Sequence, residues 1–169
     1  MDEATRRSIL LVNILTAFVF GLTTITSAVL SDRMGRRRVL IAGTVFGIAA
    51  GLLAFQIMQP GSAASFFAGV SILMIALGIP YGPAAAYLPE LFKTRYRYTG
   101  TGMGYNLAGI LGGGAPLLLA PPLAERYGGM GVAWYLSALG VISTLYLLRL
   151  KETRGVQIEI PEATAAEPA

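Results

Sequence analysis

The sequence contains neither cysteine nor histidine. Without cysteine there is no disulfide framework. Without either residue, the chain has no zinc site of the usual kind and no Cys- or His-based catalytic pair. Charge is also scarce, because Asp, Glu, Lys and Arg make up 13% of the 169 residues, against about 25% in a typical soluble domain. We therefore expect a membrane protein with no metal, no cofactor and no catalytic residue.

Apolar residues, by contrast, form five long stretches. A helix needs about 20 mostly apolar residues to cross a bilayer, and none of the five has a charged side chain in its interior. The sequence thus predicts an all-α integral membrane protein with five transmembrane helices, at about residues 8–30, 39–58, 64–87, 102–123 and 132–148. An integral membrane enzyme is the rival class, but no nucleophile, metal ligand set or acid–base pair lies within these stretches.

Basic residues gather in alternate connections between the apolar stretches. The first and third connections and the segment after the fifth stretch are rich in Lys and Arg, whereas the second has none and the fourth has only Arg126. This alternation predicts a multi-pass protein of the plasma (inner) membrane with a cytoplasmic C-terminus, and no nucleic-acid partner. With a cytoplasmic C-terminus and five spans, Arg6 and Arg7 would lie on the outer side of the membrane, against the positive-inside pattern. Because of this and the odd number of spans, we expect at least one further helix upstream.

The first connection, residues 31–38, combines an acid, a glycine and four arginines. A positive-inside anchor alone explains the arginines. Asp32 can also accept hydrogen bonds from a helix N-terminus or a guanidinium, and Gly35 permits a tight turn. The Asp-Arg-x-Gly-Arg-Arg pattern resembles the signature loop of the major facilitator superfamily, which lies between the second and third helices of each six-helix half.

Two glycine-rich patterns lie on the second and third stretches. Gly43, Gly47 and Gly51 are four residues apart and predict close packing against another helix. Pro80 and Pro83, with their flanking glycines, predict an interruption of the third stretch. A broken helix within a membrane indicates a transport path, and a simple kink is the equally favoured alternative. Tyr81 and Tyr87 are the polar aromatic residues available there.

The segment from Pro89 to Gly100, with the following run 104–116, resembles the loop between the tenth and eleventh helices of the superfamily. It is especially similar to the metabolite:proton symporter family of proline/betaine, citrate, α-ketoglutarate and shikimate carriers. The run 151–155, Lys-Glu-Thr-Arg-Gly, resembles the end of the twelfth helix.

Asn106 is the one strongly polar side chain of its span, and it either lines the path or forms an interhelical hydrogen bond.

The resemblance implies that the five spans match helices 8–12 of a twelve-helix fold. Residues 1–155 would form part of the C-terminal half of a transporter, and residues 156–169 a disordered cytoplasmic tail. The implied function is proton-coupled symport of a small organic acid or osmolyte, of the proline or betaine type, with the fragment alone inactive. The implied partners are the lipid bilayer, protons, the substrate and either the missing N-terminal half or another half-carrier.

A non-transporting half-carrier, or a truncated gene product that associates with another membrane protein, is the alternative. The residues expected to line the substrate path are Tyr81, Tyr105 and Asn106. The residues expected to form a cytoplasmic gate are Asp32, Arg33, Gly35, Arg36, Arg37, Glu90, Arg95 and Arg97.

Overall fold

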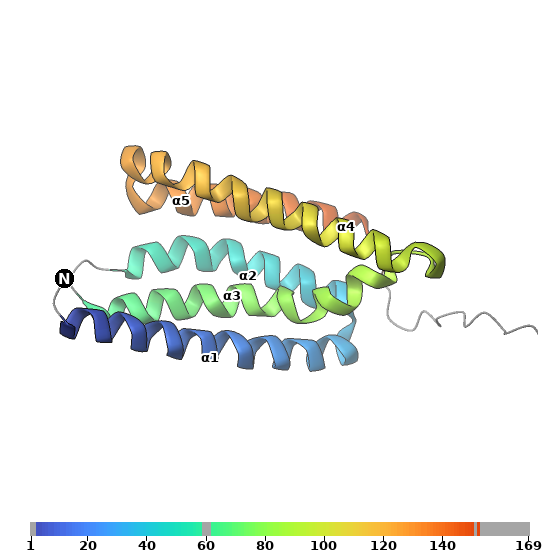
Figure 1. The fold of residues 1–169 in the computed structure, drawn as a ribbon, viewed down its shortest axis with the longest axis horizontal. Helices are drawn as coiled ribbons and strands as arrows, with labels where there is room; N and C mark the ends of the chain where they lie inside the picture. Colours follow the sequence, from blue (N-terminus) through green and yellow to red (C-terminus); the bar gives the residue numbers. More distant parts are fainter. Residues whose placement is uncertain (1–2, 59–61, 151, 153–169) are drawn as a thin grey trace, which may run out of the picture.

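The computed structural model describes residues 3–58, 62–150 and 152, and these residues form helices joined by short turns, without any strand (Figure 1). The predicted all-helical class is confirmed for this part of the chain. The expected cytoplasmic tail, residues 156–169, lies outside the described residues. The helices are α1 (Glu3–Met34), α2 (Arg36–Ile57), α3 (Ala63–Glu90), the 3₁₀ helix η1 (Thr94–Tyr96), α4 (Arg97–Gly109), the π-helical turn η2 (Ile110–Gly114) and α5 (Ala115–Arg149).

By length and composition, four segments of the described chain qualify as membrane spans: Leu10–Met34, Arg36–Ile57, Ala63–Glu90 and Thr94–Arg149. The expected count of five is not confirmed by this criterion, because the two last expected spans fall within one 56-residue segment. Gly128 has non-helical angles inside α5, with φ 66° and ψ −165°. Glycine adopts such angles without the steric cost that a Cβ brings. Figure 1 shows the chain turning back within the orange part of α5.

Helix α3 lies at the centre of the first three helices and packs extensively against both α1 and α2 (Figure 1). Helix α5 packs on α2, whereas α4 meets α3 in only a few places. The predicted close packing of the second span is confirmed at Gly43, where a Cβ would lie 2.8 Å from Cγ2 of Ile79. It is not found at Gly47, which has no such neighbour within 4 Å.

The predicted interruption at Pro80 and Pro83 is wrong, because α3 runs as one helix through both prolines. Proline at position i cannot donate to the carbonyl at i−4, so Pro83 deprives the Ile79 carbonyl of its usual partner. The buried Ser27 hydroxyl of α1 donates to that carbonyl instead. Freed carbonyls within a membrane need such a partner. A side chain from the neighbouring helix thus satisfies the carbonyl, and the helix continues.

Much of the molecule's surface is apolar. Phe18 on α1 is 75% exposed, and Leu117 and Leu118 on α5 are each 78% exposed. The fully buried apolar residues are mostly small, such as Ala50, Ala54 and Ala133. Small residues allow membrane helices to approach closely, while large apolar residues face lipid chains or further helices. The helices therefore present on their outside the kind of surface that a bilayer accommodates.

Candidate functional site

The turn between α1 and α2 consists of one residue, Gly35. Its φ of 103° lies in the region that favours glycine, and its N–H donates to the Ser31 carbonyl at 2.9 Å. A Cβ at this position would lie 2.8 Å from Oε2 of Glu152. Gly35 thus reverses the chain and leaves room for a carboxylate beside the first turn of α2.

Arg36 joins this turn to the end of α3. Its guanidinium forms a hydrogen-bonded ion pair with Glu90, and lies 3.7 Å from the Asp32 carboxylate one turn earlier. The Arg36 and Glu90 side chains are 22% and 20% exposed, whereas Asp32 is 69% exposed. Partial burial keeps solvent from screening the Arg36–Glu90 pair, so it contributes more than the exposed pair. Three of the expected gate residues therefore come together.

Arg37 and Glu152 connect the ends of α2 and α5 in both directions. The Arg37 guanidinium donates to the carbonyls of Leu147 at 2.9 Å and Leu148 at 2.5 Å, at the C-terminus of α5. In return, the Glu152 carboxylate accepts from the backbone N–H groups of Arg36 at 3.1 Å and Arg37 at 3.4 Å. Each charge lies at the helix end whose dipole it complements.

Glu152 was missing from the residues expected from the sequence to form a site. The available signal was an acid directly after the last apolar stretch, in the Lys-Glu-Thr-Arg-Gly run. Nothing in the sequence indicates that this acid reaches a turn more than a hundred residues earlier. The pairing emerges only when α5 packs antiparallel to α2, with Ser137 near Ile48 and Thr144 bonded to Thr44.

The remaining arginines of the expected gate do not join the ion pairs. Arg97 donates to the Pro89 carbonyl at 3.1 Å, near the C-terminus of α3. The Arg95 guanidinium lies 5.5 Å from the centre of the Tyr96 ring. Arg33 lines a separate cavity between α1 and α2. Within the described ranges, neither Arg33 nor Arg95 forms an ion pair.

Two of the three expected path residues meet between α3 and α4. The hydroxyls of Tyr81 and Tyr105 are 3.1 Å apart, and both side chains line a cavity of about 820 Å³ bordered by α2, α3, α4 and α5. The Phe20 ring of α1 contacts Tyr81 edge-on, with ring centres 5.4 Å apart. Tyr87 and Tyr146 also line this cavity. No charged side chain lines it among the residues that the structure describes.

Asn106 does not share this cavity. Its side-chain N–H donates to the Gly102 carbonyl at 2.8 Å, one turn back on α4. It lines a neighbouring cavity of about 650 Å³ together with Arg97, Tyr98 and Tyr105. Of the two alternatives for Asn106, the interhelical hydrogen bond is not formed, and its place in a transport path stays a prediction.

The fold and these contacts define a class. The chain is a helical membrane protein whose helix ends are joined on one side by arginine–carboxylate contacts. Comparison with known proteins gives the family: the chain belongs to the sugar (and other) transporter family, which matches residues 2–163, within the major facilitator superfamily. The members of this family are membrane transporters rather than enzymes.

Several curated proteins are similar to the chain. It is 33% identical over 150 residues to the inner membrane metabolite transport protein YhjE of Escherichia coli, covering 88% of the chain and 34% of that protein. It is 34% identical to the shikimate transporter of E. coli, over 74% of the chain and 29% of the relative. It is 32% identical to the proline/betaine transporter of Salmonella typhimurium, over 73% and 25% respectively.

The chain therefore spans about a third or less of the curated relatives it matches. No solved structure matches it.

Proposed function

We propose that this chain forms the C-terminal part of a carrier that moves a small organic acid or osmolyte across the membrane together with protons. The names of its relatives support a substrate of the shikimate, proline or betaine type. The observation that carries the proposal is the Tyr81–Tyr105 pair, which brings two hydroxyls together beside the cavity of about 820 Å³. Such a cavity lies within the roughly 300–1,000 Å³ range of small-molecule sites.

In the proposed mechanism, two helical bundles rock about a central site and expose it alternately to each side. The paired tyrosine hydroxyls can donate to a carboxylate or accept from an amine, so they suit a polar substrate in an otherwise apolar wall. The described lining of this cavity supplies no acid for proton coupling. The coupling carboxylate is therefore assigned to another part of the carrier.

The contacts around Gly35 are assigned to a cytoplasmic gate. The Arg36–Glu90 pair and the Asp32 carboxylate lie together at the ends of α1, α2 and α3, and under this proposal their pairing strengthens when that side of the carrier closes. Exposed pairs contribute up to about 1 kcal/mol each, which is enough to bias an equilibrium whose two states differ by a few kcal/mol. Under this proposal, Asp32→Asn in the whole carrier alters the transport rate, and an unchanged rate would count against the gate.

The fourth candidate span is proposed to cross the membrane twice. As one straight helix, its 56 residues would extend roughly 84 Å at about 1.5 Å per residue, far beyond a hydrocarbon core of about 30 Å. The positive φ of Gly128 supports a turn there. Two crossings would give five spans, equivalent to helices 8–12 of the superfamily, and a cytoplasmic C-terminus.

Uptake by cells that express the complete protein tests the function. Radiolabelled shikimate, proline and glycine betaine are supplied with and without a proton uncoupler. Tyr105→Phe removes one hydroxyl of the pair. We expect KM to rise about three- to tenfold, which corresponds to the net free energy of one hydrogen bond. Tyr127→Phe is the control, because Tyr127 is 69% exposed and lines neither of the two cavities that Tyr105 lines. Equal KM values for both variants would refute the assignment of the site.

The size of the native product separates the alternatives. An epitope tag is added to the C-terminus of the protein through its chromosomal gene, and the membrane fraction is blotted. A band more than twice the mass of this chain would show that a full carrier is made. A band at the mass of the chain would favour a half-carrier that needs a partner. Vesicles reconstituted with the 169-residue chain alone are expected to show no coupled uptake, and uptake by them would contradict the dependence on a second half.

A further inference from the structure

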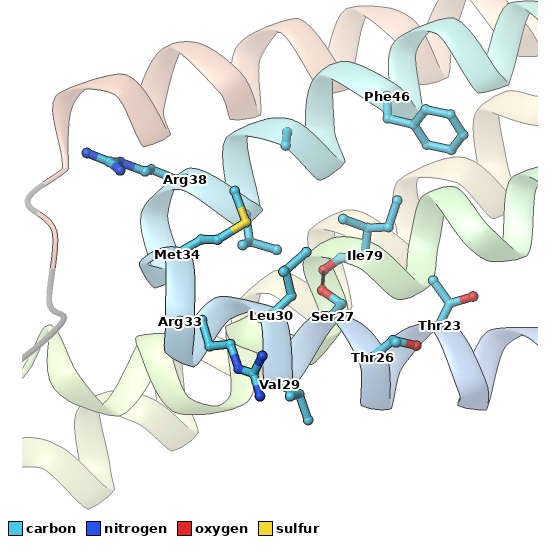
Figure 2. A pocket seen from close by; sticks show the side chains of 12 residues that line it. Thr23, Thr26, Ser27, Val29, Leu30, Arg33, Met34, Arg38, Phe46 and Ile79 are labelled. Atoms are coloured by element: carbon cyan, nitrogen blue, oxygen red, sulfur yellow. Dashed lines mark hydrogen bonds between the residues drawn. The ribbon is translucent and has the colours of Figure 1, made fainter.

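The cavity lined by Arg33, of about 600 Å³, lies between α1 and α2, and Tyr81 and Tyr105 do not line it. Its wall is mainly apolar and includes Leu30, Val39 and Phe46, with Ile79 contributed by α3. Figure 2 shows the Ser27 hydroxyl turned toward the backbone of Ile79. The hydroxyls of Thr23 and Thr26 likewise donate to carbonyls of their own helix. The hydroxyl protons are already engaged, so the cavity offers apolar contact.

Two arginines flank one end of this cavity. Arg33 lies in the last turn of α1 and Arg38 in the first turn of α2, and Figure 2 shows them on either side of Met34. Both side chains are exposed, and neither forms an ion pair within the part of the chain that the structure describes. Their neighbours Arg36 and Arg37 are engaged by Glu90 and by the end of α5.

An apolar cavity with two unpaired cations at its end matches a molecule that carries an anion at one end and a hydrocarbon chain at the other. A guanidinium binds phosphate oxygens in a bidentate manner. Basic pockets between membrane helices bind the head groups of anionic lipids. A soluble anion would bind the two arginines but would not fill the apolar cavity. A further helix would fill the cavity but would need acidic side chains of its own to pair with both arginines.

We propose that this cavity is a binding site for an anionic phospholipid, with an acyl chain between α1 and α2 and the phosphate at Arg33 and Arg38. The site is separate from the proposed substrate cavity, so its test does not depend on transport. It also does not depend on which side of the membrane the turn faces, because only the position of the arginines at the helix ends is used.

The test is a lipid titration of the complete protein in detergent, followed by native mass spectrometry. Dioleoyl phosphatidylglycerol is the anionic probe, and dioleoyl phosphatidylcholine, which is zwitterionic with no net charge, is the comparison. The double variant Arg33→Gln/Arg38→Gln is compared with Lys93→Gln/Arg149→Gln, which removes the same charge from exposed positions outside the cavity. One basic residue near an anionic surface contributes roughly a fivefold change in binding. We therefore expect a Kd about thirtyfold weaker for the first variant and little change for the second.

A second pair of variants tests the apolar part of the site. Ala42→Trp fills the cavity, whereas Ala49→Trp adds the same bulk to an exposed position of α2 that does not line it. The proposal expects Ala42→Trp alone to weaken phosphatidylglycerol binding, with helicity by circular dichroism unchanged in both. Equal affinities for the two charge variants, or for the two Trp variants, would overturn it. Capture of another protein segment by a photo-crosslinker at position 42 would overturn it as well.

Discussion

The hydrogen bond from Ser27 to the Ile79 carbonyl can be tested by a double-mutant cycle. Pro83 has no N–H, so this carbonyl lacks its usual helical donor, and the Ser27 hydroxyl takes that place. Ser27 is 5% exposed and Pro83 is fully buried. Water therefore cannot replace the hydroxyl in Ser27→Ala, and the carbonyl is left without a donor.

The size of the effect follows from the environment of the bond. Hydrogen bonds between membrane helices contribute about 0.6 kcal/mol on average and up to about 1.7, and a buried carbonyl left unsatisfied costs about 1–3 kcal/mol. We expect Ser27→Ala to lower the free energy of unfolding by about 1–2 kcal/mol. Pro83→Ala restores an N–H that can reach the same carbonyl. In that background we expect Ser27→Ala to cost only a few tenths of a kcal/mol.

The assay is reversible unfolding in mixed micelles, followed by circular dichroism, for the wild type, both single variants and the double variant. The cycle cancels whatever Pro83→Ala does by itself and leaves a coupling energy of about 1 kcal/mol. Thr26→Ala is the matched control, because the Thr26 hydroxyl is exposed and bonds within its own helix. An equal loss of unfolding free energy for Ser27→Ala in both backgrounds, or a loss no larger than that of Thr26→Ala, would show that the Ser27 hydroxyl does not replace the missing donor.

Two further predictions concern the turn between α1 and α2. Glu152→Gln removes the charge at the N-terminus of α2 and should lower stability by about 0.3–1 kcal/mol in low salt, an effect that added salt should reduce. Glu125→Gln, at an exposed position without an ion pair among the described residues, should change stability little. Gly35→Ala must adopt a φ of 103° and brings its Cβ within 2.8 Å of Glu152, so we expect a loss of about 1–2 kcal/mol. Gly47→Ala has open space within α2 and should raise stability slightly, because alanine is the better helix former. Equal thermal shifts for the two glycine variants would contradict this expectation.

The sequence predicted well those features that follow from composition along the chain. The lengths of the apolar stretches predicted the first three helices. Gly35, among the arginines that separate the first two stretches, indicated a tight turn. The ends were less well placed, because α1 begins at Glu3 and α3 extends to Glu90. Apolar length alone does not show where a helix continues beyond the hydrocarbon core.

Features that depend on a distant partner could not be predicted. Pro83 indicated a break, but Ser27, from a helix fifty residues earlier, supplies the missing hydrogen bond. Glu152 has no local pattern that points to α2. Asn106 could have formed a hydrogen bond to another helix, but it bonds its own backbone and lines the cavity of about 650 Å³ that Tyr105 also lines. The roles of the path and gate residues in transport remain predictions.

The reciprocal contact between α2 and α5 has a consequence for the order of assembly. Arg37 emerges from the ribosome long before Leu147, Leu148 and Glu152, which are its partners at the end of α5. During synthesis the N-terminus of α2 therefore lacks its carboxylate until α5 and Glu152 have been made. A chain that stops before Glu152 would lack the carboxylate that accepts from the first N–H groups of α2, so a contact made late in synthesis stabilises a turn made early.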